Sequence, residues 1–243
     1  MNKSLIVSYQ MGKVASSAIT ESISDCIQIH AWDGEEPIKY FSSRYTGSLK
    51  GRILQYFKWK NESKKLKKKL AQTEKVKLLI GVREPISRNI SGYFQTLTIR
   101  EKNKSLEEQI NMFFAYCPHL ASCYWFENEL KKFFPINIYE YDFDKQKGFT
   151  SFEKGKFEVF IYQFEKLKKL ESEIGNFLNI EDFQLSNSNS AEDKWLNGLY
   201  LEFKENITFP KGYVDMLYDS NYCKHFYSNS DIENFRKKWD KFS

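Results

Sequence analysis

The sequence has little cysteine: its 243 residues include only Cys26, Cys117, Cys123 and Cys223. They form no Cys-x-x-Cys pair, and none has a nearby histidine at zinc-finger spacing. These absences argue against a disulfide scaffold and against a structural metal site. We therefore expect a protein of a reducing compartment that requires no metal.

Long apolar runs are also missing. The first apolar stretch, Leu5 to Val7, is followed at once by Ser8, Tyr9 and Gln10, which is far short of a signal-peptide core. No run approaches the roughly 20 apolar residues of a membrane-spanning helix. We expect a cytoplasmic protein without a transmembrane segment.

The excess of positive charge is small, with 37 Lys and Arg against 32 Asp and Glu and a formal net charge of +5. This balance suits anionic ligands but gives no reason to expect nucleic acid. With 41% hydrophobic and 17% aromatic residues, most of the chain is able to bury a core, which excludes disorder. No internal repeat or clean linker is visible, so we expect a single domain over residues 1–243.

The pattern of apolar residues predicts an α/β fold. The chain opens with a strand at 5–8, a loop with Gly12 and a helix over 17–24, the strand-loop-helix start typical of such folds. Residues 76–82 are typical of a buried parallel strand, and Pro85 favours a helix directly after it. Further strands are predicted at 26–30, 136–141 and 157–162, and further helices at 105–116, 120–133 and 167–178.

A lysine-rich segment at 58–77 holds nine lysines against Glu62 and Glu74. Its apolar residues are too sparse for a wide apolar stripe, so it is predicted to be an exposed helical excursion. Two interpretations remain open: a basic face that attracts an acidic polymer, or a solvated helix flanking the sheet. We favour the second, because charge runs are usually solvated surface.

The first motif that carries chemistry is the loop Tyr9-Gln-Met-Gly-Lys-Val-Ala-Ser-Ser-Ala18 after the first strand. Its backbone N–H groups and the helix that follows favour a phosphate, and Lys13 adds a positive charge. A nucleotide-binding P-loop has a first glycine where Ser8 stands, and a magnesium-binding hydroxyl where Val14 stands. A magnesium-dependent nucleotide site is therefore disfavoured.

The second motif, Arg83-Glu-Pro-Ile-Ser-Arg-Asn-Ile-Ser-Gly-Tyr93, follows the predicted strand at 76–82. Ligands of open α/β sheets bind at such carboxyl ends, and arginine binds phosphate in a fork geometry. Ser91 lies eight residues after Arg83, about two helical turns, so its hydroxyl is able to face the same side. Together the two motifs indicate a nucleotide phosphorylated at two ends.

On these residues the sequence resembles the sulfotransferases that use 3′-phosphoadenosine 5′-phosphosulfate (PAPS) as co-substrate. That family has a loop of the Pro/Gly-Lys-x-x-Ser-[ST] kind after the first strand and an Arg-[DE]-Pro-x-x-Arg-x-x-Ser-x-[YF] segment. The resemblance implies a P-loop-like, three-layer αβα sandwich with a central, mostly parallel sheet. It also implies that Arg83 and Ser91 hold the 3′-phosphate, and that the 5′-phosphosulfate is held by Gly12, Lys13, Val14, Ala15, Ser16 and Ser17.

Two later segments, 187–200 and 225–239, look like bacterial proteins labelled putative capsular polysaccharide synthesis proteins, which are similar to carbohydrate sulfotransferases. The resemblance implies sulfuryl transfer from PAPS to a hydroxyl of a carbohydrate, a capsular or other cell-surface polysaccharide or its precursor. This acceptor is expected to be the partner, with a polyanionic glycan among the candidates.

Two residues are candidates for the catalytic roles. Lys13 is the candidate cation beside the departing phosphate oxygen. His30 ends the predicted strand at 26–30, on the edge where the phosphate loop also opens, and histidine suits proton abstraction near neutrality. A histidine in this region is the base in some glycan sulfotransferases, but a core or capping role for His30 stays open. The alternative bases are the carboxylates Asp33, Glu35 and Glu36.

Other residues receive weaker assignments. Arg88 is expected to be structural, and His119 and His225 are expected to serve packing or capping. Asn187 and Lys194 are candidates for closing the nucleotide or acceptor cleft, or belong to a solvated loop.

Two other functions remain as alternatives. One is a non-catalytic binding module for acidic polysaccharide, and the other is a nucleotide kinase with an atypical phosphate loop. The complete set of Lys13, Ser16, Arg83 and Ser91 speaks against a decayed nucleotide site.

Overall fold

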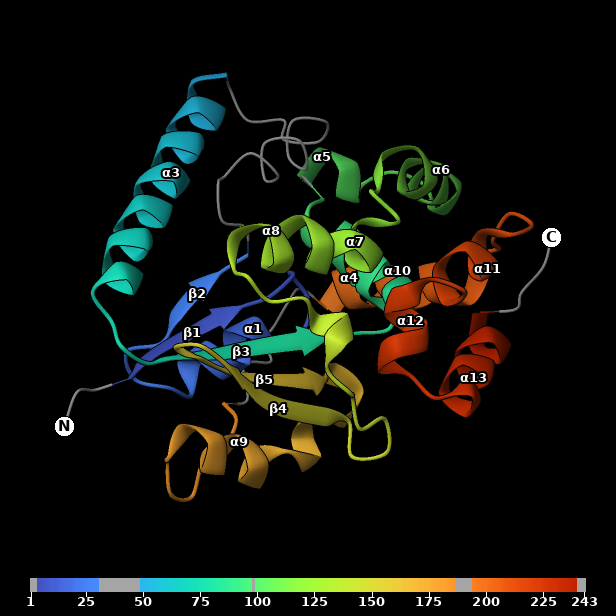
Figure 1. Cartoon of the computed structure of the whole chain (residues 1–243). Helices are drawn as coiled ribbons and strands as arrows, with labels where there is room; N and C mark the ends of the chain where they lie inside the picture. Colours follow the sequence, from blue (N-terminus) through green and yellow to red (C-terminus); the bar gives the residue numbers. More distant parts are fainter. Residues whose placement is uncertain (1–3, 31–48, 98, 187–193, 240–243) are drawn as a thin grey trace. The chain divides into compact units, whose positions relative to one another are not determined.

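The computed structural model describes residues 4–30, 49–97, 99–186 and 194–239 (Figure 1). The chain folds into two compact units, and each takes two separate segments of the sequence. Unit 1 comprises Met1–Val82 and Trp125–Ser188, and unit 2 comprises Arg83–Tyr124 and Asn189–Ser243. Because the segments of the two units alternate along the sequence, no single linker divides the units.

Unit 1 contains a five-stranded mixed sheet in the order β2-β1-β3-β5-β4. Its strands are β1 (Leu5–Tyr9), β2 (Ile27–Ile29), β3 (Val76–Val82), β4 (Phe149–Lys154) and β5 (Phe157–Gln163). β2, β1, β3 and β5 are parallel, and β4 pairs antiparallel with β5 at the edge. The protein is therefore an α/β protein with a mostly parallel sheet, as predicted.

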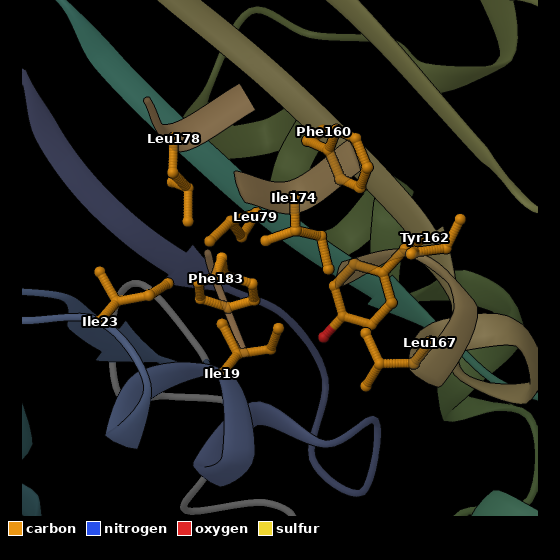
Figure 2. Close-up of a cluster of buried hydrophobic side chains, with 10 residues drawn as sticks. Ile19, Ile23, Leu79, Phe160, Tyr162, Leu167, Ile174, Leu178 and Phe183 are labelled. Atoms are coloured by element: carbon orange, nitrogen blue, oxygen red, sulfur yellow. The ribbon is translucent and has the colours of Figure 1, made fainter. Parts of the chain in front are cut away.

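Every residue of β3 is buried, because both faces of the sheet are covered. On one face Leu79, Phe160 and Tyr162 pack against α1 (Ser16–Glu21) and α9 (Glu171–Leu178) (Figure 2). This cluster of buried side chains comprises Ile19, Ile23, Leu79, Phe160, Tyr162, Leu167, Leu170, Ile174, Leu178 and Phe183.

On the other face, Tyr9 contacts the rings of Trp125 and Phe134, with ring centroids 5.0 and 5.1 Å apart. These rings flank the π-helix η1 (Phe126–Leu130) and α8 (Lys131–Phe133). The remaining helical segments of unit 1 are α3 (Leu49–Ala71), η2 (Ile138–Glu140) and η3 (Phe164–Lys169). The sheet thus lies between two helical layers.

One predicted strand, 136–141, is wrong: the segment contains the 3-10 helix η2 instead. Ile136 and Ile138 are both 1% exposed, so the apolar pattern reports burial rather than strand pairing. The free edge of β5 is taken by β4, which the sequence analysis missed, through a hairpin whose Gly155 adopts a φ of +59°. With that edge occupied, β5 offers no second side for another strand.

Unit 2 is helical in its described part. Its elements are α4 (Pro85–Gln95), α5 (Ile99–Lys102), α6 (Leu106–Tyr116), α7 (Ala121–Trp125, whose last residue is assigned to unit 1), α10 (Lys194–Asn206), α11 (Tyr213–Tyr218), α12 (Asn221–Phe226) and α13 (Asn229–Trp239). No described helix of the protein combines the length and the apolarity that a membrane span needs.

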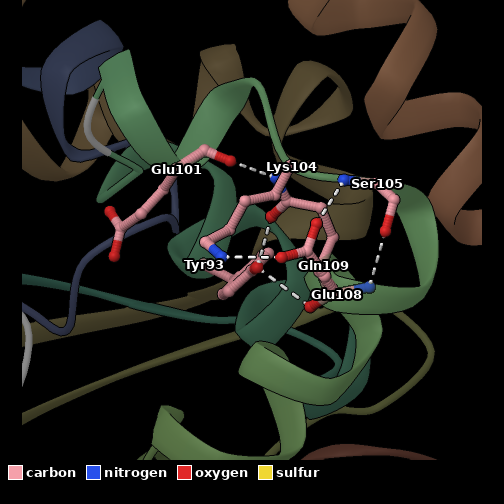
Figure 3. A network of polar contacts seen from close by, with 6 residues as sticks. All are labelled: Tyr93, Glu101, Lys104, Ser105, Glu108 and Gln109. Atoms are coloured by element: carbon pink, nitrogen blue, oxygen red, sulfur yellow. Dashed lines mark hydrogen bonds and ion pairs between the residues drawn. The ribbon is translucent and has the colours of Figure 1, made fainter.

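Polar contacts join α4 to α6 (Figure 3). The Tyr93 hydroxyl donates toward Gln109, 2.9 Å from its carbonyl oxygen and 2.5 Å from Oε1. Ser105 and Glu108 cap α6 reciprocally, with each side chain accepting from the other's backbone N–H. Hydrogen bonds from Lys104 and Ser105 lower the pKa of Glu108 to about 2.

Aromatic rings fill the interior of unit 2. Phe203, on α10, is fully buried, with its ring centroid 5.7 Å from that of Tyr93 and 5.1 Å from that of Phe94. Leu201, two residues earlier on the same helix, is 55% exposed.

We expect Phe203→Ala to lower the free energy of unfolding by about 3–5 kcal/mol, because it removes buried apolar surface and leaves a cavity. Leu201→Ala, on the exposed side of the same helix, is expected to change it by about 0.5 kcal/mol or less. Urea denaturation of both variants and the parent measures the difference, and equal effects would contradict this packing. If Phe203→Ala fails to fold, Phe203→Leu gives a smaller loss of the same sign.

Candidate functional site

The loop after β1 has an unusual backbone. Lys13 and Ala15 adopt left-handed conformations, with φ of 72° and 65°, which cost a non-glycine residue roughly 1–2 kcal/mol each. Successive backbone N–H groups in such turns form concavities that bind anions. A Cβ added at Gly12 would meet no atom within 4 Å, so the space beside this residue is open. The backbone of this loop is therefore of the kind that forms such concavities.

The buried side chain of Gln10 holds this loop to the sheet. Its Oε1 accepts from the backbone N–H of Gly81 on β3 at 2.5 Å and from the Tyr162 hydroxyl on β5 at 2.8 Å. Its Nε2 donates to the Ser8 hydroxyl at 2.8 Å. A Cβ at Gly81 would lie 2.7 Å from Gln10 Oε1, so this strand position requires glycine. The start of the loop is therefore fixed to β1, β3 and β5.

Tyr162 fixes the loop at a second point, because its hydroxyl also lies 3.0 Å from the carbonyl oxygen of Val14, between Lys13 and Ala15. Burial raises the pKa of Tyr162, so the hydroxyl keeps its proton and remains a donor. The strained turn is thus held from its interior side, while Lys13 is half-buried and Ser17 is exposed.

His30 lies beside the same loop. Its Nδ1 is 2.8 Å from the carbonyl oxygen of Gln10, which accepts only, so Nδ1 carries the proton. Its Nε2 is 3.0 Å from Nε2 of Gln28, whose Oε1 accepts from the Thr20 hydroxyl at 3.0 Å. This chain of contacts leaves the lone pair of the neutral imidazole on Nε2. His30 is exposed, so the alternative of a core histidine is wrong.

The buried carboxylate of Glu129 contacts the last residue of β1, directly before this loop. Glu129, in the π-helix η1, accepts from the Tyr9 hydroxyl at 2.5 Å. The neighbouring Trp125 donates from Nε1 to the carbonyl oxygen of His30 at 3.2 Å. These contacts anchor the end of β1 and the residue after β2.

In the first turn of α1 the two serines differ. Ser16 is 7% exposed, and its carbonyl oxygen accepts from the Thr20 hydroxyl at 2.5 Å. Ser17 is exposed. Within unit 1 the structure therefore brings together the predicted loop residues, from Gly12 to Ser17, and His30.

The second motif belongs to unit 2. The Tyr222 hydroxyl accepts from the Arg83 backbone N–H and donates to the Arg83 carbonyl oxygen, both at 2.9 Å. The backbone of Arg83 is thus held without use of its guanidinium. Ser91 lies on α4 and is half-buried. Arg88, expected to be structural, has its Nη1 3.3 Å from Oδ1 of Asn89.

Glu84 is a structural residue that the sequence analysis missed. It is 1% exposed and caps α4, accepting from the N–H groups of Ile86 at 2.7 Å and Ser87 at 2.8 Å. Its carboxylate also accepts from the Tyr218 hydroxyl at 2.7 Å and from Trp239 Nε1 at 3.2 Å. Burial and the Glu84 charge raise the pKa of Tyr218, which keeps that donor protonated. A carboxylate before Pro85 at a helix start was the one available signal.

His119 packs as expected, between the rings of Phe113 and Tyr213. Its Nδ1 lies 2.7 Å from the Tyr213 hydroxyl and its Nε2 lies 3.3 Å from the Phe114 carbonyl oxygen. Burial lowers the pKa of His119, which favours the neutral ring. Its ring nitrogens serve the fold.

Several candidates lie outside the described residues. These are the alternative bases Asp33, Glu35 and Glu36, and also Asn187. Lys194 begins α10, but its side chain is not among those described.

We expect Glu84→Gln to lower the free energy of unfolding by about 2–4 kcal/mol, because it turns one acceptor of a buried, fully bonded carboxylate into a donor that faces other donors. Glu107→Gln, an exposed glutamate of the same unit, is the matched control and is expected to change it by about 0.5 kcal/mol or less. Chemical denaturation checks both. A Glu84→Gln protein as stable as the control would show that the carboxylate is not needed.

Comparison with known proteins gives one family. The family model NKWYS, described as "Putative capsular polysaccharide synthesis protein", matches residues 101–228, more than half of the chain. No curated protein and no solved structure matches significantly. On the strength of that match, the chain belongs to this capsular polysaccharide synthesis family.

Proposed function

We propose that the protein is a PAPS-dependent sulfotransferase that transfers a sulfuryl group to a hydroxyl of a carbohydrate in capsular or cell-surface polysaccharide synthesis. The observation that carries the proposal is the loop between β1 and α1, with its two left-handed residues Lys13 and Ala15. Family membership supports the polysaccharide as the class of acceptor.

The donor is assigned to the two motifs. The backbone of Gly12 to Ser17 and the Lys13 ammonium suit the 5′-phosphosulfate. The Arg83 guanidinium and the Ser91 hydroxyl suit the 3′-phosphate. β1 and β3 are parallel neighbours, and the two motifs follow their carboxyl ends directly in the chain, where ligands of open α/β sheets bind. We therefore assign the P-loop-like sulfotransferase fold to this sheet.

In the proposed reaction an acceptor hydroxyl oxygen attacks sulfur, and the bond from sulfur to the 5′-phosphate oxygen breaks. Sulfur gains one S–O bond and loses another, 3′-phosphoadenosine 5′-phosphate leaves, and the hydroxyl proton passes to a base. Negative charge grows on the departing phosphate, where Lys13 stabilises it. The proposed reaction accounts for every bond, proton and charge without a metal ion.

The contacts of His30 support it as the base. Because Nδ1–H donates to the Gln10 carbonyl oxygen, Nε2 is the nitrogen able to take the proton, and protonation turns it into a second donor. The amide of Gln28 lies 3.0 Å from this nitrogen, so an acceptor hydroxyl has to displace that amide. Gln28 is thus placed to cover the base until an acceptor binds.

Binding of the reaction product tests the donor assignment. We expect calorimetric titration in chelating buffer to give micromolar affinity for 3′-phosphoadenosine 5′-phosphate and little affinity for ADP or ATP. Arg83→Ala is expected to weaken this binding about 10- to 100-fold, the loss of a charge-assisted contact, and to leave binding of adenosine 5′-phosphosulfate, which lacks the 3′-phosphate, little changed.

Arg88→Ala, a second arginine of the same motif, is the matched control and is expected to weaken both nucleotides equally or neither. Equal losses for both nucleotides in Arg83→Ala would remove Arg83 from this role. Binding of ATP only with magnesium would favour the kinase. Absence of all nucleotide binding would favour the polysaccharide-binding module.

The base is tested by turnover. We expect His30→Ala to lower transfer of labelled sulfate from PAPS to a panel of oligosaccharides by about 10²- to 10⁴-fold, the usual contribution of a general base, with product affinity within about twofold of the parent. Gln28→Ala keeps the imidazole and is expected to retain most of the turnover. Unchanged turnover in His30→Ala would instead direct the search to Asp33, Glu35 and Glu36.

A further inference from the structure

The helix α3 has one buried side and one strongly basic side. Ser63, Leu66 and Leu70 are 5%, 4% and 6% exposed, at the three- and four-residue spacing of one helix face. Lys64, Lys65, Lys67, Lys68 and Lys69 lie between them in the sequence and are all exposed. The last two turns of α3 therefore present lysine to solvent and almost nothing else.

Four of these lysines, Lys64, Lys65, Lys68 and Lys69, define what we call the lysine face. In the described part of the chain, no carboxylate lies within ion-pair distance of any of them. Two pairs within the face, 64 with 68 and 65 with 69, stand at the i, i+4 spacing at which like charges destabilise a helix by a few tenths of a kcal/mol each. The face therefore carries an electrostatic cost that a bound anion would relieve.

Other lysines of unit 1 are neutralised locally. Lys75 and Lys77 pair with Glu158 at 3.3 and 3.4 Å, and Lys147 pairs with Asp144 at 3.4 Å. Among the described side chains of unit 1, lysines thus have acidic partners in several places, but not on the lysine face.

The lysine face lies near the amino ends of the parallel strands, whereas the phosphate loop follows a carboxyl end. Lys156 donates from Nζ to the carbonyl oxygens of Leu70 and Thr73, which places the end of α3 beside the start of β5 (Figure 1). The phosphate loop follows the opposite, carboxyl end of β1, whose five residues span about 17 Å. A small ligand cannot reach both places, but a polymer can.

The composition of the face favours one class of polymer. It holds lysine and no arginine, whose planar fork is preferred for nucleic-acid phosphates. Among the described side chains of α3, Phe57 is the exposed aromatic, at 54%, about two helical turns before Lys64. A single ring falls short of the continuous apolar side that a membrane-bound helix needs. Lysine as a set of point charges suits carboxylate or sulfate groups spaced along a chain, and the family acts in capsular polysaccharide synthesis.

We propose that the lysine face of α3 binds an anionic polysaccharide chain at a distance from the reacting hydroxyl. Identification of that chain as the acceptor rests on the proposed function. Binding of the polymer itself does not, because it needs only the charges of α3. The face then selects long anionic acceptors over short or neutral ones.

The test uses the full chain with Lys64, Lys65, Lys68 and Lys69 all changed to Gln. The matched control changes four exposed lysines elsewhere in unit 1, Lys131, Lys154, Lys168 and Lys169, to Gln, and removes the same charge. The probes are long-chain hyaluronan, a hyaluronan tetrasaccharide and neutral dextran. Binding is followed by light scattering or fluorescence at several salt concentrations.

We expect the parent to bind long hyaluronan more tightly than the tetrasaccharide and not to bind dextran. The α3 variant is expected to lose at least about tenfold in hyaluronan affinity with a shallower salt dependence, and the control less than about twofold. Equal losses in both variants, or no preference for hyaluronan over dextran, would overturn the proposal. Tighter binding to single-stranded DNA or to phosphatidylglycerol vesicles than to hyaluronan would overturn it in favour of those partners.

Titration with 3′-phosphoadenosine 5′-phosphate separates the two proposals. Its affinity is expected to be unchanged in both lysine variants, because neither alters the phosphate loop. Loss of nucleotide binding in the α3 variant alone would overturn the assignment of a remote polymer site. A parent protein that binds hyaluronan but no nucleotide would instead leave the lysine face supported and the sulfotransferase proposal refuted.

Discussion

The side-chain amide of Gln10 is the contact on which the candidate site of unit 1 depends. One oxygen accepts from a backbone N–H of β3 and from a hydroxyl of β5, while the backbone carbonyl of the same residue orients His30. A buried amide without hydrogen-bond partners lowers the stability of the fold. Gln10 is therefore held in the one position in which these bonds are made. The loop keeps two strained residues, Lys13 and Ala15, because these contacts fix the chain before them, at Gln10, and between them, at Val14.

In unit 2 a buried carboxylate, rather than an amide, holds the motif to its surroundings. The Glu84 carboxylate ends the strand-to-helix connection by capping α4, and its remaining oxygen lone pairs take donors from α11 and from Trp239 at the end of α13. The backbone of its neighbour Arg83 is held by the Tyr222 hydroxyl. Within unit 2, Glu84 thus fixes the start of α4, and the Tyr222 hydroxyl fixes the backbone of Arg83, the residue before it.

The sequence predicted local features well and tertiary partners poorly. The bounds of β3 and the carboxyl-end position of both motifs follow from short-range patterns, since a continuous apolar run and a proline after it are visible in the sequence. The strand expected at 136–141 failed, because burial of Ile136 and Ile138 arises from packing and produces the same apolar pattern as a strand. Gln10, Tyr162 and Glu84 went unrecognised because each has a partner far away in the sequence: Tyr162 follows Gln10 by 152 residues, and Tyr218 follows Glu84 by 134.

The family match covers residues 101–228, which lie after both motifs, yet this segment supplies the partners of both. Tyr162 holds Gln10 and Val14 of the loop after β1, Tyr218 holds the Glu84 carboxylate, and Tyr222 holds the Arg83 backbone. Each tyrosine acts through a buried or half-buried hydroxyl whose loss would leave a motif residue without its bond. Within each unit, the matched segment therefore supplies the side chains that hold one of the two motifs.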